Sequence, residues 1–151
     1  MNSHPDRITL TQDEVTEALA RGQARHVRAV MRATEAGGEG PMPVLAAYQM
    51  NACAQAALAK HLAVPVDAVG VDEEDADLAV AHGADDPIMH VRTKMPIGGM
   101  PVYDNDPDDR ILVAALPDHD ATGSVDLRRW LFLGWLRAGD GKRQEHRVPR
   151  A

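Results

Sequence analysis

Apolar side chains recur at helical spacing in the first part of the chain, and this pattern predicts two helices. Thr11 followed by Glu14 matches a capping box, so the first helix is expected to begin there and to end near residue 36, before a glycine-rich segment. Its expected buried stripe is Val15, Leu19, Val27, Val30 and Met31. The opposite side is expected to be basic, through Arg21, Arg25, His26, Arg28 and Arg32.

A second helix is predicted over residues 44–63, because this segment is rich in alanine, the strongest helix former. It is apolar around most of its circumference, which is typical of a buried helix. Its small side chains would also allow close approach to a sheet. Asn51 and Gln55 are four residues apart and therefore share one face of this helix.

Short β-branched or aromatic runs bounded by turn residues predict strands in the rest of the chain. The expected strands are 88–93, 111–116 and 129–136, with a weak strand at 68–71 and a return strand beginning at 100–103. Residues 105–109 and 117–123 have turn chemistry. This order predicts an α/β (α+β) fold, in which a small mixed sheet of about three to five strands is packed by the two N-terminal helices.

The length of 151 residues suits one domain. We expect a flexible N-terminus over residues 1–8, one domain over 9–143 and a basic tail over 144–151. No apolar run approaches the roughly 20 residues that span a bilayer, and the N-terminus has no signal pattern, so a cytoplasmic protein with no membrane partner is expected. The lone Cys53 lies among alanines and is expected to be a small buried hydrophobe rather than a catalytic thiol.

The net charge of −7 argues against a broad surface for nucleic acid. The charges are unevenly distributed, since residues 67–86 contain eight acids and no Lys or Arg. Residues 128–150 instead carry seven Arg and Lys against two acids. The basic end could therefore lie beside phosphates while the acidic stretch faces water or binds a cation, or both could be ordinary solvated surface.

Common catalytic motifs are missing from the sequence. It contains no glycine-rich phosphate loop after a strand, no Gly-x-Ser-x-Gly elbow and no Cys-x-x-Cys pair, and its seven histidines lack the spacing of a zinc helix. Most nucleotide-binding, hydrolase and zinc-module classes are thereby excluded.

One constellation remains, around the predicted strand 88–93. Asp85 and Asp86 precede it, His90 and Arg92 share one of its faces, and Lys94 continues that face. Carboxylates bind a hard cation such as magnesium, which activates water and stabilises charge on a phosphate, while a nearby cation positions the phosphate. The pattern is therefore compatible with metal-dependent phosphodiester cleavage.

Four stretches occur in an order and spacing that resemble phage- and mobile-element-encoded proteins of the PD-(D/E)XK nuclease-like fold. They are an alanine-rich helix, an Asp…Glu-Val-Arg strand, an Asp-Pro-Asp-Asp turn into an apolar strand and a strand ending in Gly-Trp, here residues 51–62, 85–93, 106–113 and 133–136. The resemblance covers about residues 44–143. It implies a restriction-endonuclease-like core, DNA as the partner and a divalent metal, magnesium or manganese, as the cofactor.

The departures from this family fall on the chemistry. Gln55 stands where the family has Glu, and His90 stands where it has Glu, Asp or Gln, whereas Asp85 and Arg92 match. The resemblance implies catalytic positions at Gln55, His90 and Arg92 and metal ligands at Asp85, Asp86 and His90. An amide brings no charge and a histidine prefers zinc or manganese, so poor magnesium affinity and weak or absent hydrolysis are expected. Contacts to nucleic acid are expected from Arg92, Lys94, Arg128, Arg129, Lys142 and Arg143.

Each candidate residue also has a purely structural interpretation. Gln55 could bind a backbone carbonyl, His90 could be a partly buried strand residue, Arg92 and Lys94 could be the charged face of an edge strand, and residues 85–87 could be a turn. Three functions stay open: a non-cleaving nuclease-like protein, an active nuclease using Asp85, Asp86, His90 and Arg92, and an acidic factor that binds a host or phage protein through residues 72–77. The most informative observation is the position of Gln55 relative to Asp85 and His90. If these side chains converge in one cleft with Arg92, the nuclease-like interpretation survives, and if Gln55 points elsewhere, only the fold survives.

Overall fold

The computed structural model describes residues 6–38, 40, 42–71, 89–93 and 99–143. In chain order its elements are β1 (Asp6–Thr9), α1 (Gln12–Glu35), α2 (Leu45–Leu62), the 3₁₀ turn η1 (Val66–Ala68), β2 (Val69–Val71), β3 (Met89–Arg92), β4 (Ile111–His119), β5 (Val125–Arg137) and α4 (Ala138–Lys142). Both predicted helices are confirmed to within about two residues at each end. No helix in the described ranges combines the length and apolar character that crossing a membrane requires.

The start of α1 is fixed by the predicted capping box. The Glu14 N–H donates to Thr11 Oγ1 at 3.1 Å, and the Thr11 N–H donates to Glu14 Oε1 at 2.8 Å. Lys60 at the end of α2 donates to Glu14 Oε1 at 2.7 Å and to the Thr9 carbonyl at 2.9 Å. This hydrogen bond from Lys60 is the main reason that the pKa of Glu14 is lowered. One lysine therefore joins the ends of β1, α1 and α2.

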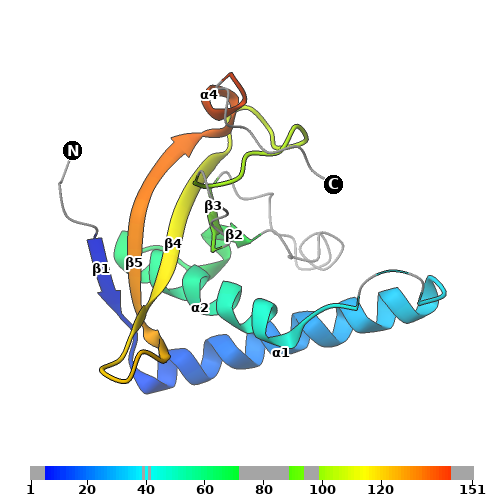
Figure 1. Cartoon of the computed structure of the whole chain (residues 1–151), viewed down its shortest axis with the longest axis horizontal. Coiled ribbons are helices and arrows are strands. Elements are labelled where there is room, and N and C mark those ends of the chain that lie inside the picture. Colours follow the sequence, from blue (N-terminus) through cyan, green and yellow to red (C-terminus); the bar gives the residue numbers. More distant parts are fainter. Residues whose placement is uncertain (1–5, 39, 41, 72–88, 94–98, 144–151) are drawn as a thin grey trace.

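The described strands form one five-stranded mixed sheet in the order β1-β5-β4-β3-β2 (Figure 1). Strands β2, β3 and β4 are parallel, whereas β5 is antiparallel to both β4 and β1. The predicted mixed sheet packed by two N-terminal helices is thus confirmed. Whether its core is restriction-endonuclease-like stays a prediction.

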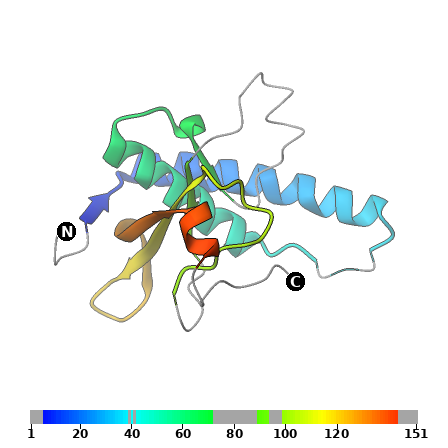
Figure 2. The same cartoon turned by 90° about the horizontal axis from the view of Figure 1, so that it is seen from above.

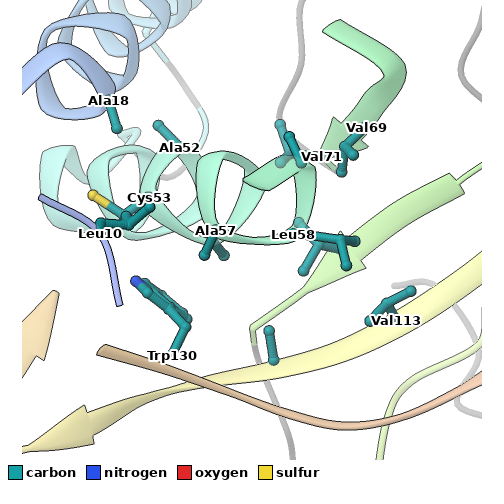
Figure 3. Close-up of a cluster of buried hydrophobic side chains, with 14 of the residues drawn as sticks. Leu10, Ala18, Ala52, Cys53, Ala57, Leu58, Val69, Val71, Val113 and Trp130 are labelled. Carbon is teal, nitrogen blue, oxygen red and sulfur yellow. The ribbon is translucent and has the colours of Figure 1, made fainter. Parts of the chain in front are cut away.

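Helix α2 lies on one face of this sheet, and α1 packs against α2 (Figures 1 and 2). The main core forms where the alanine-rich side of α2 meets the valines of β2, β3 and β4, with Trp130 of β5 beneath Leu10 and Cys53 (Figure 3). Cys53 is fully buried, as predicted, and burial raises the pKa of its thiol to about 11. Because this face of α2 is made of small side chains, the helix comes close to the strands.

The predicted apolar stripe of α1 is partly wrong. Val15 is buried as predicted, but Val27 and Met31 are 48% and 57% exposed, and the other buried positions are Ala18, Gly22, Arg25 and Ala29. The reason is the close approach of the two helices, since a Cβ on Gly22 would lie 2.7 Å from the Tyr48 carbonyl oxygen. Only small residues fit against α2 at this point, and larger apolar side chains are displaced toward solvent.

Three further expectations from the sequence are corrected. Residues 6–8 belong to strand β1, so the expected flexible N-terminus does not extend to residue 8. Residues 100–103 form no strand, because Val102 packs with Leu112 and Ala138 in a small second core on the other face of the sheet. Residues 138–142 form the short helix α4 with a buried side, although no element was expected there. Strands β4 and β5 also extend further than predicted, to His119 and from Val125.

Candidate functional site

The two faces of β3 have different environments. Val91 packs in the core under α2 together with Val69 and Val71 of β2, so the alternating residues Gly70, His90 and Arg92 face the opposite side. Consistent with this, a Cβ on Gly70 would lie 2.5 Å from His90 Nε2. The ring of His90, which is 7% exposed, covers the backbone of Gly70. Any larger residue at position 70 would therefore clash with this ring.

Gln55 lies on the α2 side of the sheet and is completely buried. Its Oε1 accepts a hydrogen bond from Arg25 Nη1 at 2.9 Å, and its Nε2 donates to the carbonyls of Val69 at 2.5 Å and Val66 at 3.3 Å. A guanidinium only donates and a carbonyl only accepts, so this orientation of the amide is fixed by its neighbours. The structural interpretation of Gln55, a bond to a backbone carbonyl, is confirmed.

This arrangement bears on the expected metal site. The Gln55 oxygen, which the family resemblance places in a catalytic position, accepts from a buried guanidinium, and a divalent cation there would meet that positive charge. Gln55 also lies across the sheet from His90 and Arg92, so these residues do not converge in one cleft. Asn51, on the same face of α2, accepts a hydrogen bond from Thr93 at 2.7 Å. Both polar residues of this helix face therefore anchor α2 to the sheet.

Arg92 is engaged in a buried ion pair. Its Nη1 and Nη2 donate to the two carboxylate oxygens of Asp106 at 2.8 and 2.6 Å, and Nη1 also donates to the Pro101 carbonyl at 2.8 Å. The guanidinium stacks over the ring of Tyr103, 4.7 Å from its centroid. Both side chains of the pair are 2% exposed. In this position Arg92 holds the segment 101–106 against β3, and it does not face solvent as the edge-strand interpretation required.

Asp106 is the centre of this cluster. Burial acts to raise the pKa of its carboxyl group, but hydrogen bonds from Arg92 and from the Tyr103 N–H, together with the charges of Arg92 and Arg110, hold that pKa below its ordinary value. Lys142 of α4 donates to the Asp106 carbonyl and, at 2.9 Å, to Asp108. The charges around Arg92 thus join β3, the loop before β4 and the C-terminal helix.

The other predicted contacts to nucleic acid lie beside carboxylates. Arg128 and Arg129 of β5 lie 3.3 and 3.7 Å from Asp126, Lys142 bonds Asp108, and Arg143 pairs with Asp140. Arg128 and Arg129 are still more than half exposed. The Asp126 carboxylate that they share is only 10% exposed.

The remaining predicted site residues, Asp85, Asp86 and Lys94, lie outside the described residues. Within the described ranges, no three His, Cys, Asp or Glu side chains come together in a way that would hold a metal. Of the residues predicted for the metal site, only His90 is therefore placed, and it stays a predicted ligand.

The structure contains a pocket that the sequence did not predict. It lies beyond the last turn of α2, has a volume of about 440 Å³, and is lined mainly by apolar side chains of α2, β3, β4 and β5. Trp135, which is 69% exposed, and Phe132 contribute its aromatic surface. The signal in the sequence nearest to this pocket is Gly134-Trp135, which also belongs to the stretches that resemble the nuclease-like fold.

The chain was compared with family models, curated proteins and solved structures, and none of them matches it. The resemblance to the PD-(D/E)XK nuclease-like fold therefore rests on the sequence stretches alone.

Proposed function

We propose that this protein is a nuclease-like protein that binds nucleic acid and has lost efficient phosphodiester hydrolysis. The observation that carries the loss of hydrolysis is the use of Gln55. Where the related motif has a carboxylate, this chain has an amide, and both ends of the amide are hydrogen-bonded inside the core. A carboxylate could not donate to the Val69 carbonyl, so the neutral side chain fits this environment better than a carboxylate would.

The distribution of charge supports contact with nucleic acid. Seven acids lie between residues 72 and 86, where there is no Lys or Arg, so the remaining 16 acids are balanced by the 16 Lys and Arg elsewhere. Arg7 and Arg129 lie on the sheet face away from α2, because Ile8 and Trp130, which alternate with them, pack in the core. Two exposed arginines on one strand pair offer a small site for phosphates.

The proposal is tested by fluorescence anisotropy with labelled single- and double-stranded DNA, using an Arg7→Glu/Arg129→Glu double variant. We expect the double variant to bind more weakly and to lower the slope of log K against log salt by about 1 for each lost phosphate contact. Arg32→Glu, an exposed arginine on α1, is the matched control and should bind as the wild type does. Equal binding by wild type and double variant would refute this surface.

The hydrolytic part of the proposal needs a separate assay. The same DNA is incubated with the protein in magnesium and in manganese, and we expect no cleavage above background. Robust metal-dependent cleavage that disappears in Asp85→Ala would instead establish the active nuclease.

The acidic stretch favours a second candidate function, an inhibitor or accessory factor that docks on a basic protein of a phage or its host. Residues 72–86 carry seven acids and no Lys or Arg, which equals the whole net charge of −7. A pull-down that compares the wild type with a variant neutralised at Asp72, Glu73, Glu74 and Asp75 tests this candidate. An unchanged set of partners would remove it.

A further inference from the structure

The pocket beyond α2 exists because a bulge changes the alternation of β5. Ala115 faces Phe132 and Val113 faces Trp135, so the partner strand advances by two residues while β5 advances by three. Gly134 supplies the positive φ of 156° that this bulge requires. As a result, Phe132 and Trp135 both face the α2 side of the sheet, whereas strict alternation would place them on opposite faces.

The walls of the pocket are aromatic and apolar. His61 from the last turn of α2 packs against Phe132, with ring centroids 5.5 Å apart, and Ile111 and Val113 of β4 form the floor. Trp135, which directly follows the bulge, stands at the open side of the pocket. Pockets of about 300–1,000 Å³ with mainly apolar walls and a few polar groups are typical of sites for small-molecule ligands.

The polar groups at the rim complement one kind of ligand. The Asp6 carboxylate lines the pocket and lies 3.6 Å from His61 Nε2, and it can only accept hydrogen bonds while ionised. On the other side Arg137 is exposed and lies opposite Ile111, on the same face as Trp135. A carboxylate and an aromatic ring therefore line the cavity, and a cation lies on the same sheet face, two residues beyond the ring.

We propose that this pocket binds one unstacked nucleobase of single-stranded nucleic acid. The base stacks on Trp135, its donor edge faces Asp6, and the adjoining phosphate approaches Arg137. Guanine fits best, because its Watson–Crick edge carries two neighbouring N–H donors for the two carboxylate oxygens. The inference rests on the proposed binding of nucleic acid, and it adds the form of the strand and the type of base.

An apolar side chain of a partner protein, or a second copy of this chain, would fill the apolar walls equally well. Neither would use the acceptor at Asp6 together with the cation at Arg137. Stacking of unpaired bases on exposed aromatic rings, with hydrogen bonds to their Watson–Crick edges, is the usual way in which single strands are recognised. The combination of groups therefore favours a nucleobase.

The test uses the full chain and the fluorescence of its two tryptophans, of which Trp130 is buried and Trp135 is exposed. A short oligothymidine with one central guanine is titrated as a single strand and as a duplex. We expect the single strand to quench Trp135 and the duplex to leave it unchanged. Trp135→Ala should weaken single-strand binding by roughly 5- to 140-fold. Leu133→Ala, an exposed apolar residue on the same strand, is the matched control and should have no effect.

Asp6→Asn tests the type of base. The variant should lose the preference for the guanine-containing strand over plain oligothymidine and keep its affinity for the latter. Unfolding midpoints equal to those of the wild type would exclude a folding defect as the cause.

The possible failures can be told apart. Wild-type single-strand binding by Trp135→Ala, with weakened binding by Arg7→Glu/Arg129→Glu, would overturn the base pocket and leave the proposed function intact. Quenching of Trp135 by free guanosine without binding of any strand would support the pocket and overturn the function. A change in sedimentation of Trp135→Ala without any effect of nucleotides would assign the pocket to a second copy and overturn the inference.

Discussion

Gln55→Glu is the substitution that most directly probes the interpretation of the site. It keeps the shape of the side chain but replaces a donor by an acceptor. One carboxylate oxygen would then lie where Nε2 lies now, 2.5 Å from the Val69 carbonyl oxygen and 3.3 Å from that of Val66. The buried Val69 carbonyl loses this donor, and oxygen faces oxygen at the shorter distance, whereas the part-buried Val66 carbonyl still accepts from the Val69 N–H.

The size of the effect follows from these contacts. The buried Val69 carbonyl that loses this donor costs about 1–3 kcal/mol, and the fully buried carboxylate adds a desolvation penalty. The stronger bond from Arg25 offsets part of this cost. We therefore expect Gln55→Glu to lower the free energy of unfolding by about 2–4 kcal/mol.

Urea denaturation followed by circular dichroism measures this difference. With a slope of about 2 kcal/mol per molar urea, the midpoint should fall by about 1–2 M. Gln23→Glu, the same exchange at an exposed position of α1, should change stability by less than about 0.5 kcal/mol. Two results would show that position 55 is an available ligand site and that the reasoning is wrong. One is a Gln55→Glu variant as stable as the wild type, and the other is a melting temperature that manganese raises in this variant but not in the wild type.

Three further predictions follow from the packing. Asp106→Asn should cost about 3–5 kcal/mol at neutral pH by leaving Arg92 buried without its carboxylate. The pKa of Asp106 in the folded protein is depressed, so the stabilisation by its carboxylate is fully present above the unfolded pKa of about 3.9 and is lost as the pH falls through the folded pKa. Asp106→Asn should therefore lose less stability than the wild type as the solution is acidified. Gly22→Ala should destabilise by about 1–3 kcal/mol in thermal melts, despite the better helix propensity of alanine, because its Cβ meets Tyr48. Cys53 should resist alkylation in the native protein and react only at the rate of unfolding, as mass spectrometry would show.

Elements with local signals could be predicted from the sequence. The start of α1 depends on Thr11 and Glu14, which are three residues apart, and α2 depends on its own alanines. Strand β1 has no such signal, because Asp6, Arg7 and Thr9 are polar and the strand exists only through pairing with β5. Long-range pairing of this kind leaves no pattern in the segment itself.

The site was harder to predict because its contacts join distant parts of the chain. The bond from Gln55 to a carbonyl was one expected interpretation, but Arg25 was assigned to the exposed basic side of its helix. A charged residue in a buried stripe has no periodic signal that separates it from a surface residue. Phe132 and Trp135 are three residues apart, and only the bulge at Gly134 brings them to one face.

The pairing of β1 with β5 also has a consequence for how the chain folds. Asp6 lies opposite Phe132, so the first strand and the longest strand come from nearly opposite ends of the sequence. During synthesis β1 cannot pair until β5, near the other end of the sequence, has been made, and such non-local pairing slows folding. The helical pair α1 and α2 can form earlier from local contacts, and the closing of this sheet edge is expected to be among the last steps.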